Sequence, residues 1–403
     1  METEHESIEN YEDRASTILV KFYTKLQEPF ALPEEQCELS VPDSCTRKDL
    51  SLLINDLLAL PEPRAFDFSL ADNFLRSTLD KHIAQYGMST ESTIDIEYLF
   101  LTVPEESKDK APHEDWVSGI KRVSSNKMLT SCYDGSLRIF DDATFEILHT
   151  EKISDEAVKC IDFNGKDIIA YSMDFKLRSY EFDGEKISKC KHEYVGFEDT
   201  VQAVTFSTCD NTLFIAAAAD GCYLYEIGRS EPIRKFTVGE NAFMAVSFTA
   251  PECFYAGSLD HSLRKFDIES GLCTQTWNSH SPILAIAATD DGMLLTAHAD
   301  RVRLWDPSLG KGLKATYRSG PAILTDISVS PTKTALMFAT SAVDGSITIW
   351  DSRSTNEPLY VRRNLTQYQQ RSLCVDFCRP DKCYYGSSKW CGAIDIVANV
   401  KEE

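Results

Sequence analysis

The sequence predicts a mainly β protein in which a propeller of seven four-stranded blades follows a small α+β domain. A short motif returns from residue 131 onward, at intervals of 40 to 47 residues. Residues 17–100 lack this motif and mix strand-like with helix-like segments. At 403 residues the chain is long enough for both parts, and no apolar run of 18 residues suggests a membrane span.

The recurring motif has the chemistry of a tight hairpin between two buried strands. Its first copy reads Ser131-Cys-Tyr-Asp-Gly-Ser-Leu-Arg-Ile-Phe-Asp141. Asp-Gly favours a tight turn, and the alternating apolar residues bury one face of each strand. The turn falls at positions 134, 174, 220, 260, 300, 344 and 391, separated by 40, 46, 40, 40, 44 and 47 residues. With another apolar strand before each hairpin, this period resembles the WD-repeat β-propeller, with a degenerate seventh copy at Cys391.

Blade five carries polar residues that we expect to form a structural tetrad: His280, Thr296, Asp300 and Trp305. A histidine, an aspartate and a hydroxyl could also form a catalytic triad. The repeat already explains their spacing, however, and it places them inside a blade wall. The sequence also lacks the phosphate-binding, dinucleotide-binding, zinc-protease and serine-hydrolase motifs. We therefore expect no catalytic residues and no enzyme activity.

The N-terminal part reads as an alternation of strands and helices. The expected strands are Ile18–Thr24, Cys37–Pro42, Ala65–Leu70 and Ser92–Tyr98. Thr46 and Asp49 predict the start of a helix that Pro61 ends, and Phe74–Tyr86 reads as a second helix stopped by Gly87. Strand, strand, helix, strand, short helix, strand is the order of a ubiquitin-like fold.

These segments predict four regions along the chain. Residues 1–16 form an acidic disordered tail, 17–100 the ubiquitin-like domain, 101–115 a linker and 116–403 the propeller. Few residues remain after Val400 to complete blade seven. Because an unpaired sheet edge invites aggregation, residues near 98–104 are candidates to close the ring. The N-terminal domain could instead use the same strand.

Charge and cysteine content restrict the partners and the compartment. The formal net charge is −22, and residues 1–115 hold 25 acidic against 10 basic side chains. This balance disfavours free nucleic acid and favours partners with basic or metal-bearing faces, or it serves solubility alone. The 13 cysteines are expected to be reduced thiols inside the cell. Cys374, Cys378, Cys383 and Cys391 lack the spacing of a zinc site, so we expect no bound metal or cofactor.

The order of the two domains, together with several short segments, is similar to one family of assembly factors. The segments are Val20–Thr24, Phe66–Phe68, Phe74–Leu79, Ile96–Tyr98 and Glu114–Ser118. They resemble the WD-repeat subunit of the PeBoW complex, which has a Notchless-like ubiquitin-like domain. The resemblance covers the chain from about residue 17 onward. This chain lacks the long acidic insertion that some relatives carry between propeller strands.

The resemblance implies a scaffold in large (60S) ribosomal subunit biogenesis and rRNA maturation, in the nucleolus and nucleoplasm. The propeller would bind the block-of-proliferation-type WD-repeat protein, and with it pescadillo, on pre-60S particles. The N-terminal domain would bind the MIDAS domain of the AAA ATPase Midasin, whose Mg²⁺ is completed in trans by one carboxylate. The matching residue here is Glu91, in Gly87-Met-Ser-Thr-Glu-Ser-Thr-Ile94. No membrane partner and no dominant direct nucleic-acid binding are implied.

Two alternatives belong to other classes of WD-repeat protein. A Notchless-type assembly factor shares both domains but has a longer chain and usually eight blades, whereas seven repeats occur here. A generic WD-repeat adaptor in ubiquitin ligation or signalling would instead use a basic propeller face to hold a modified substrate. Copurification of pescadillo would distinguish the assembly factor from the adaptor.

Overall fold

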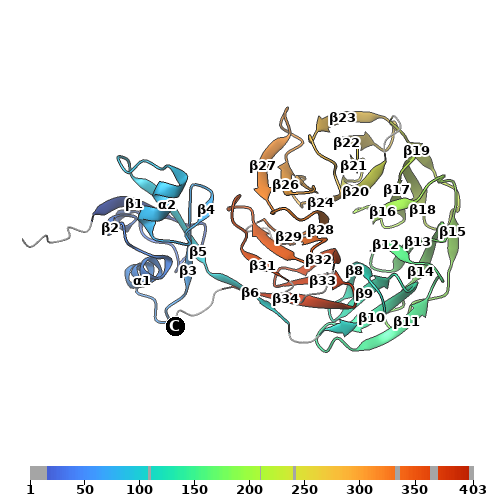
Figure 1. Cartoon of the computed structure of the whole chain (residues 1–403), viewed down its shortest axis with the longest axis horizontal. Helices are drawn as coiled ribbons and strands as arrows, with labels where there is room; N and C mark the ends of the chain where they lie inside the picture. Colours follow the sequence, from blue (N-terminus) through green and yellow to red (C-terminus); the bar gives the residue numbers. More distant parts are fainter. Residues whose placement is uncertain are drawn as a thin grey trace, which may run out of the picture. The chain divides into compact units, whose positions relative to one another are not determined.

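The computed structural model describes residues 16–107, 110–208, 210–238, 242–331, 336–363 and 371–398. The chain divides into two units, one of residues 1–103 with 397–403 and one of residues 104–396. The ribbon in Figure 1 shows the first in blue and the second in teal to red. The expected acidic tail lies outside the described residues, apart from Ser16.

The N-terminal unit is built on a five-stranded sheet with the order β2-β1-β5-β3-β4. β1 and β5 are parallel, and the other neighbours are antiparallel. This mixed arrangement agrees with the predicted ubiquitin-like order. The elements are β1 (Thr17–Tyr23), η1 (Glu34–Gln36), β2 (Glu38–Pro42), α1 (Arg47–Leu58), β3 (Phe66–Leu70), β4 (Asn73–Phe74), α2 (Leu79–Tyr86) and β5 (Ile94–Phe100).

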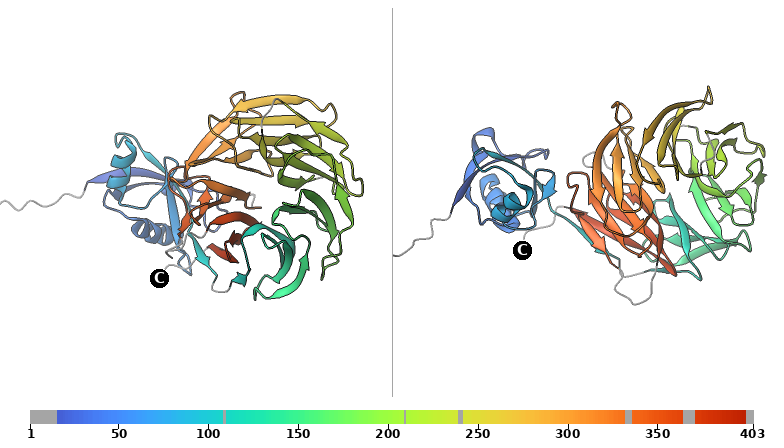
Figure 2. Two further views of the ribbon diagram at one scale, coloured as in Figure 1. Left: turned by 45° about the vertical axis from the view of Figure 1, so that its right-hand side comes forward. Right: turned by 45° about the horizontal axis from the view of Figure 1, so that its top comes forward.

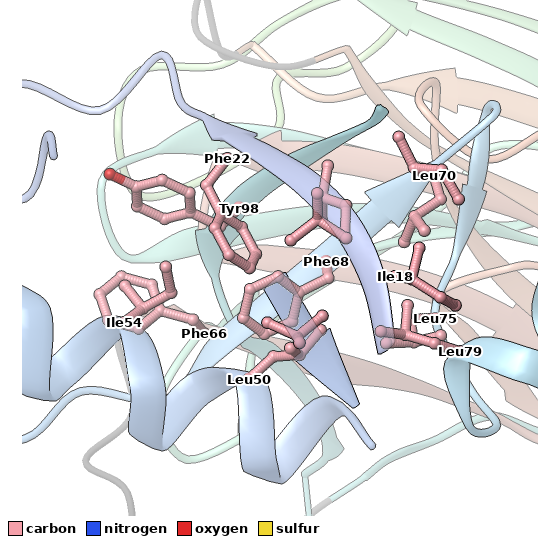
Figure 3. Close-up of a cluster of buried hydrophobic side chains, with 14 of the residues drawn as sticks. Ile18, Phe22, Leu50, Ile54, Phe66, Phe68, Leu70, Leu75, Leu79 and Tyr98 are labelled. Carbon is pink, nitrogen blue, oxygen red and sulfur yellow. The ribbon is translucent and has the colours of Figure 1, made fainter. Parts of the chain in front are cut away.

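Side-chain burial alternates along β1 and indicates which face of this sheet is covered. Every second residue of β1 is buried and the residues between are exposed, as expected for a strand with one face on a core. Leu50 and Ile54 of α1 pack onto that face, in a cluster that Figure 3 shows from the side. Thr46 and Asp49 form the predicted capping box at the start of α1. The labelled core residues are Ile18, Phe22, Leu50, Ile54, Phe66, Phe68, Leu70, Leu75, Leu79 and Tyr98.

The second helix is shorter than the predicted Phe74–Tyr86. It begins at Leu79, because Phe74 pairs with Ser69 in a small hairpin between β3 and β4. The connecting residues Ala71 and Asp72 have φ angles of 47° and 60°, which makes the turn tight. Pairing with β3 satisfies backbone hydrogen-bonding groups of this segment. The apolar side chains that suggested a helix, Phe74 and Leu75, are buried in the hairpin as well.

The described residues of the propeller unit form seven sheets, which Figures 1 and 2 show arranged in a ring. Blade one is β8 (Val117–Ser124), β9 (Lys127–Cys132), β10 (Ser136–Asp141) and β11 (Ile147–Lys152). Blade two is β12 (Val158–Phe163), β13 (Asp167–Ser172), β14 (Lys176–Glu181) and β15 (His192–Tyr194). Blade three is β16 (Val201–Phe206), β17 (Leu213–Ala218), β18 (Gly221–Glu226) and β19 (Arg234–Phe236).

The remaining blades repeat this order. Blade four is β20 (Phe243–Ala250), β21 (Cys253–Ser258), β22 (Ser262–Asp267) and β23 (Cys273–Asn278). Blade five is β24 (Ala285–Ala288), β25 (Leu294–Ala297), β26 (Arg301–Trp305) and β27 (Leu313–Arg318). Blade six is β28 (Leu324–Val329), β29 (Met337–Ala342), β30 (Ile347–Asp351) and β31 (Tyr360–Arg362). Blade seven is β32 (Ser372–Arg379), β33 (Lys382–Ser387), β34 (Trp390–Ala398) and β6 (Thr102–Glu106), with β7 (Ala111–Pro112) also paired to β34.

The outer strand of blade seven comes from the linker segment, which was also a candidate to close the ring. Ser107 N donates to Ala393 O at 2.9 Å, and His113 N donates to Lys389 O at 2.8 Å. Between these bonds Ala111 lies opposite Cys391. The N-terminal sheet takes β5, so the domain and the propeller use successive strands and do not compete for one.

A carboxylate on this closing segment joins blades six and seven. Glu106 accepts hydrogen bonds from the Tyr385 hydroxyl and from Arg362 Nε, the latter at 3.0 Å. Lys110 Nζ lies 2.9 Å from the same oxygen, and the Arg362 guanidinium lies 4.6 Å from the centre of the Tyr385 ring. Burial alone would raise the pKa of Glu106, but Tyr385, Lys110 and Arg362 together lower it. Glu106 is therefore ionised and anchors the closing strand.

Removing the closing segment should damage the propeller more than removing the N-terminal domain. We expect the fragment 102–403 to be monodisperse and to unfold cooperatively, because it keeps β6 and β7. The fragment 114–403 should aggregate or melt at a clearly lower temperature, because it exposes the edge of β34. Size-exclusion chromatography and thermal unfolding would compare them. Equal behaviour of the two fragments would contradict this account of ring closure.

The matched single substitution is Glu106→Gln in the full chain. It keeps an acceptor for Tyr385 but removes the charge that faces Arg362 and Lys110. Loss of a partly buried, charge-assisted interaction should lower the free energy of unfolding by about 1–3 kcal/mol. Urea denaturation at neutral pH measures this. Glu105→Gln, which changes the neighbouring exposed carboxylate, should leave the urea midpoint unchanged.

Candidate functional site

Glu91 lies on the short connection between α2 and β5. Gly87 ends α2 with a φ of 63°, and Met88 N donates to Ile83 O at 3.0 Å. Met88 then packs on the core of the domain, and Ile94 at the start of β5 is 4% exposed. The connection is therefore fixed at both ends by apolar burial.

Between these anchors the side chain of Glu91 is exposed, as are those of Ser89, Thr90 and Ser92. Ser89 Oγ accepts a hydrogen bond from Glu91 N at 3.3 Å, which orders the turn without engaging the carboxylate. The carboxylate is thus presented to solvent from an anchored loop. This placement suits binding to a metal that a partner holds, since a hard cation prefers carboxylate oxygens.

The structure corrects the predicted tetrad of blade five. Thr296 and Trp305 are paired, since Trp305 Nε1 donates to Thr296 Oγ1 at 2.8 Å. The histidine that joins them is His298, whose Nε2 lies 2.8 Å from Thr296 Oγ1. His280 is exposed with a φ of 55°, and the carboxylate of Asp300 binds the Arg301 guanidinium.

Strand geometry explains why His298 replaces His280. Side chains two residues apart in an extended segment lie on the same face, so His298 falls beside Thr296. His298 Nδ1 donates to Pro282 O at 2.8 Å, so its Nε2 is the acceptor for the Thr296 hydroxyl. The chain of donors then runs from Trp305 through Thr296 and His298 to Pro282. Thr296 and His298 are both 0% exposed, so the group braces the blade and offers no accessible nucleophile.

A second histidine of this kind, which was not predicted from the sequence, lies in the closing segment. His113 Nε2 lies 2.9 Å from Thr130 Oγ1 in blade one, and its ring packs at 5.1 Å from Phe140. Phe140 occupies the position that Trp305 has in blade five. The sequence signal for this role is the position of His113 just before the first inner strand. The interpretation of residues 101–115 as a linker assigned no role to that histidine.

Burial holds both histidines neutral. It lowers the pKa of His298 to about 4, with Arg303 contributing in the same direction. The pKa of His113 is also lowered to about 4, again mainly by burial, against a smaller opposing effect of the Ala111 carbonyl. Neutral imidazole is the form that both hydrogen-bond chains require.

The inner strands of the seven blades line a central channel of about 610 Å³. Polar side chains in the channel connect neighbouring blades. Lys121 Nζ of blade one lies 3.3 Å from Asp162 Oδ1 of blade two, and Asp162 Oδ2 accepts a hydrogen bond from Phe206 N of blade three at 2.8 Å. Asp162 is the main cause of the raised pKa of Lys121, and burial raises the pKa of Asp326 to about 6. These side chains bond neighbouring blades to one another and so stabilise the ring.

No group of three or more histidine, cysteine, aspartate or glutamate side chains in the described residues could hold a metal ion. Cys374, Cys383 and Cys391 are buried in the apolar clusters of blades six, seven and one. Nothing is described of the Cys378 side chain. Within the described residues, every helix is too short or too polar to cross a membrane.

The two blade-five histidines should respond differently to substitution. His298→Ala should lower the free energy of unfolding by about 1–3 kcal/mol, because it leaves the buried Thr296 hydroxyl without its imidazole acceptor. His280→Asn, a residue that tolerates the left-handed conformation, should change it by less than about 0.5 kcal/mol. Urea denaturation of both variants at neutral pH is the measurement. The reverse order of effects would restore His280 to the tetrad.

Acid should destabilise the propeller through these buried histidines. The pKa of His298 is about 4 in the folded chain and about 6.5 in the unfolded chain, so the unfolded chain binds more protons between these values. The stability is fully present above pH 6.5 and is lost as the pH falls toward 4. One histidine should account for about 2 kcal/mol of loss by pH 5.

Replacing His298 with a residue that does not titrate isolates this effect from other groups, including Asp326. We expect His298→Gln to be less stable at pH 7.5 but to lose less further stability between pH 6.5 and 5 than the unaltered chain. Urea midpoints across this range would show the difference in slope. An identical pH dependence would mean that His298 is not held neutral by the fold.

Comparison with known proteins agrees with this architecture. Residues 18–83 match the NLE (NUC135) domain, and residues 108–141 match the WD domain, G-beta repeat. The chain is 28% identical to "Ribosome biogenesis protein WDR12 homolog" of Chlamydomonas reinhardtii, with 84% of this chain and 87% of the relative covered. It is 26% identical to the WDR12 homolog of Oryza sativa subsp. japonica, over 96% of this chain and 98% of the relative. "Ribosome biogenesis protein ytm1" of Schizosaccharomyces pombe is 27% identical, with 85% and 87% covered. This chain, with an NLE domain followed by a WD-repeat propeller, is therefore similar along most of its length to proteins named for ribosome biogenesis.

Proposed function

We propose that the chain is a non-catalytic scaffold in the biogenesis of the large ribosomal subunit and the maturation of its rRNA. It would act in the nucleolus and nucleoplasm, on pre-60S particles. The observation that carries the proposal is the combination of both domains with similarity along the chain to proteins named for ribosome biogenesis. The hydroxyl and imidazole of blade five are buried inside a blade wall, which supports a role in binding over one in catalysis.

The propeller would bind the block-of-proliferation-type WD-repeat protein and, through it, pescadillo. In the described residues, seven sheets form a closed ring that presents turns and connections on two faces, and the strands of each sheet are hydrogen-bonded to one another. Surfaces of this kind suit the docking of another folded protein, because little ordering entropy is lost on binding. The net charge of −22 supports a protein partner over direct contact with rRNA.

The N-terminal domain would bind the MIDAS domain of Midasin, which releases the factor from the particle. In this proposal Glu91 supplies a carboxylate oxygen to the Mg²⁺ that Midasin holds. Two features support this role: the side chain is exposed, and its loop is anchored by Met88 and Ile94. Pre-organisation of the loop would leave only the carboxylate rotamers to be ordered on binding.

Glu91→Asp tests the metal contact because it keeps the charge and shortens the side chain by one methylene. We expect loss of Mg²⁺-dependent binding to the purified Midasin MIDAS domain, measured by calorimetry with and without EDTA. Pre-60S loading through the propeller should persist, so the variant should block release in a dominant-negative way. Glu35→Asp changes an exposed carboxylate of the same domain and should bind normally. Unaltered affinity of the Glu91→Asp protein, or binding that survives EDTA, would contradict the metal contact.

The propeller should bind its WD-repeat partner without the N-terminal domain. We expect the fragment 102–403, which keeps the closing strand, to copurify with the block-of-proliferation-type protein as efficiently as the full chain. Affinity purification followed by detection of that protein and of pescadillo is the measurement. A folded fragment that fails to copurify with them would assign the partner to the N-terminal domain, and failure of the full chain as well would refute the proposed complex.

A further inference from the structure

We propose that one edge of blade two is the docking site for the WD-repeat partner, and that it receives an apolar side chain flanked by lysine or arginine. This inference rests on the proposed function and specifies the surface used. The site, here named the blade-two patch, comprises Met173 and Phe175 in the turn between β13 and β14. It also includes Asp155, Glu156 and Asp199 in the two connections that flank this turn.

The backbone at Phe175 is unfavourable for the residue that occupies it. Its φ is 62°, in the left-handed region. The same position in blades one and six is occupied by Gly135 and Gly345, with φ angles of 81° and 80°, and in blade four by His261, a type enriched in this conformation. A bulky residue is strained there, because its Cβ comes too close to a carbonyl oxygen. The turn alone would therefore favour glycine.

Packing inside the blade does not explain Phe175 either. Its side chain is 61% exposed, and Met173 on the same turn is 40% exposed. Met173 N donates to Ala157 O at 2.8 Å, which fixes the turn against the connection from blade one to blade two. Two large apolar side chains thus project from a rigid support into solvent. A strained, exposed aromatic residue that neither turn nor core requires points to a binding role.

The surroundings of these apolar side chains are acidic. The Asp155 side chain is fully exposed, and Glu156 next to it is also exposed. On the other flank, Phe197 packs at 6.0 Å from Tyr171 of β13, the strand that leads into this turn, and so brings the connection that carries Asp199 next to it. Asp199 and Glu198 are both exposed.

The basic groups of this region are already engaged. Lys176 lies 3.4 Å from Glu193, and Lys152 donates to the Asp134 carbonyl at 2.6 Å and lies 4.0 Å from Asp155. Lys159 is bonded to Gln202, and Arg178 pairs with Asp174 and Glu193. The complementary ligand is therefore an apolar side chain with basic neighbours, which would cover Phe175 and Met173 and pair with the acids. A phosphate backbone or an acidic segment would be repelled.

Phe175→Gly separates folding from binding, because the two should change in opposite directions. Glycine adopts a φ of 62° without strain, so the melting temperature of the full chain should stay the same or rise by a few degrees. The affinity for the purified block-of-proliferation-type propeller should fall at least tenfold, mainly through a faster dissociation rate. Surface plasmon resonance and thermal unfolding would measure both on the same preparation.

Two further variants complete the experiment. Asp155→Lys with Glu156→Lys should slow association and reduce its dependence on salt. Leu272→Ser, at a 65% exposed leucine on the β22–β23 connection of blade four, should leave affinity unchanged. Undiminished affinity of Phe175→Gly, while the unaltered chain binds, would overturn the blade-two patch but leave the proposed function in place. A fall in melting temperature would overturn it also, by giving Phe175 a structural role. Absence of binding by the unaltered chain would refute the proposed partner and this inference together.

Discussion

Closure of the ring by a strand distant in sequence is the constraint on which the propeller depends. Blade seven has three strands from the C-terminal end of the ring, and its fourth comes from Thr102–Glu106. Without that strand, β34 would end the sheet with unpaired backbone groups. Glu106 strengthens the closure by joining Arg362 of blade six to Tyr385 of blade seven. His113 adds a contact to blade one. The segment between the two domains is therefore part of the propeller core.

A second group of interactions stabilises the blades from inside. The imidazoles of His113 and His298 are buried and neutral, and each accepts a hydrogen bond from a threonine hydroxyl. In the channel, Lys121 and Asp162 join the inner strands of adjacent blades. These groups resemble catalytic residues only in their chemical types. The two histidines are buried and bonded at both ring nitrogens, and an unsatisfied polar group in such a place would destabilise the fold.

The candidate binding groups have the opposite character. Glu91 lies on a loop whose ends are buried and whose centre is exposed, and Phe175 lies on a turn that is tied to the neighbouring connection. The backbone of each residue is anchored by neighbouring contacts, but neither side chain contributes to the packing of the core. The fold fixes where each side chain lies and leaves it exposed to a partner. This separation would let the proposed metal-binding carboxylate and the proposed docking residue serve recognition without conflict with stability.

The sequence by itself determined the architecture, because strand alternation and the Asp-led turns are local properties. It gave the spacing of seven hairpins, the capping box of Thr46 and Asp49, and the exposed position of Glu91 on a loop. The tertiary structure replaced His280 with His298 in the blade-five tetrad, because the His298 ring bonds both Thr296 and the Pro282 carbonyl of the preceding connection. It also decided that Asn73–Phe74 forms a strand, through pairing with β3. The sequence offered residues near 98–104 either to close the ring or to join the N-terminal sheet. Only the tertiary structure chose between these uses, through hydrogen bonds between residues almost three hundred positions apart.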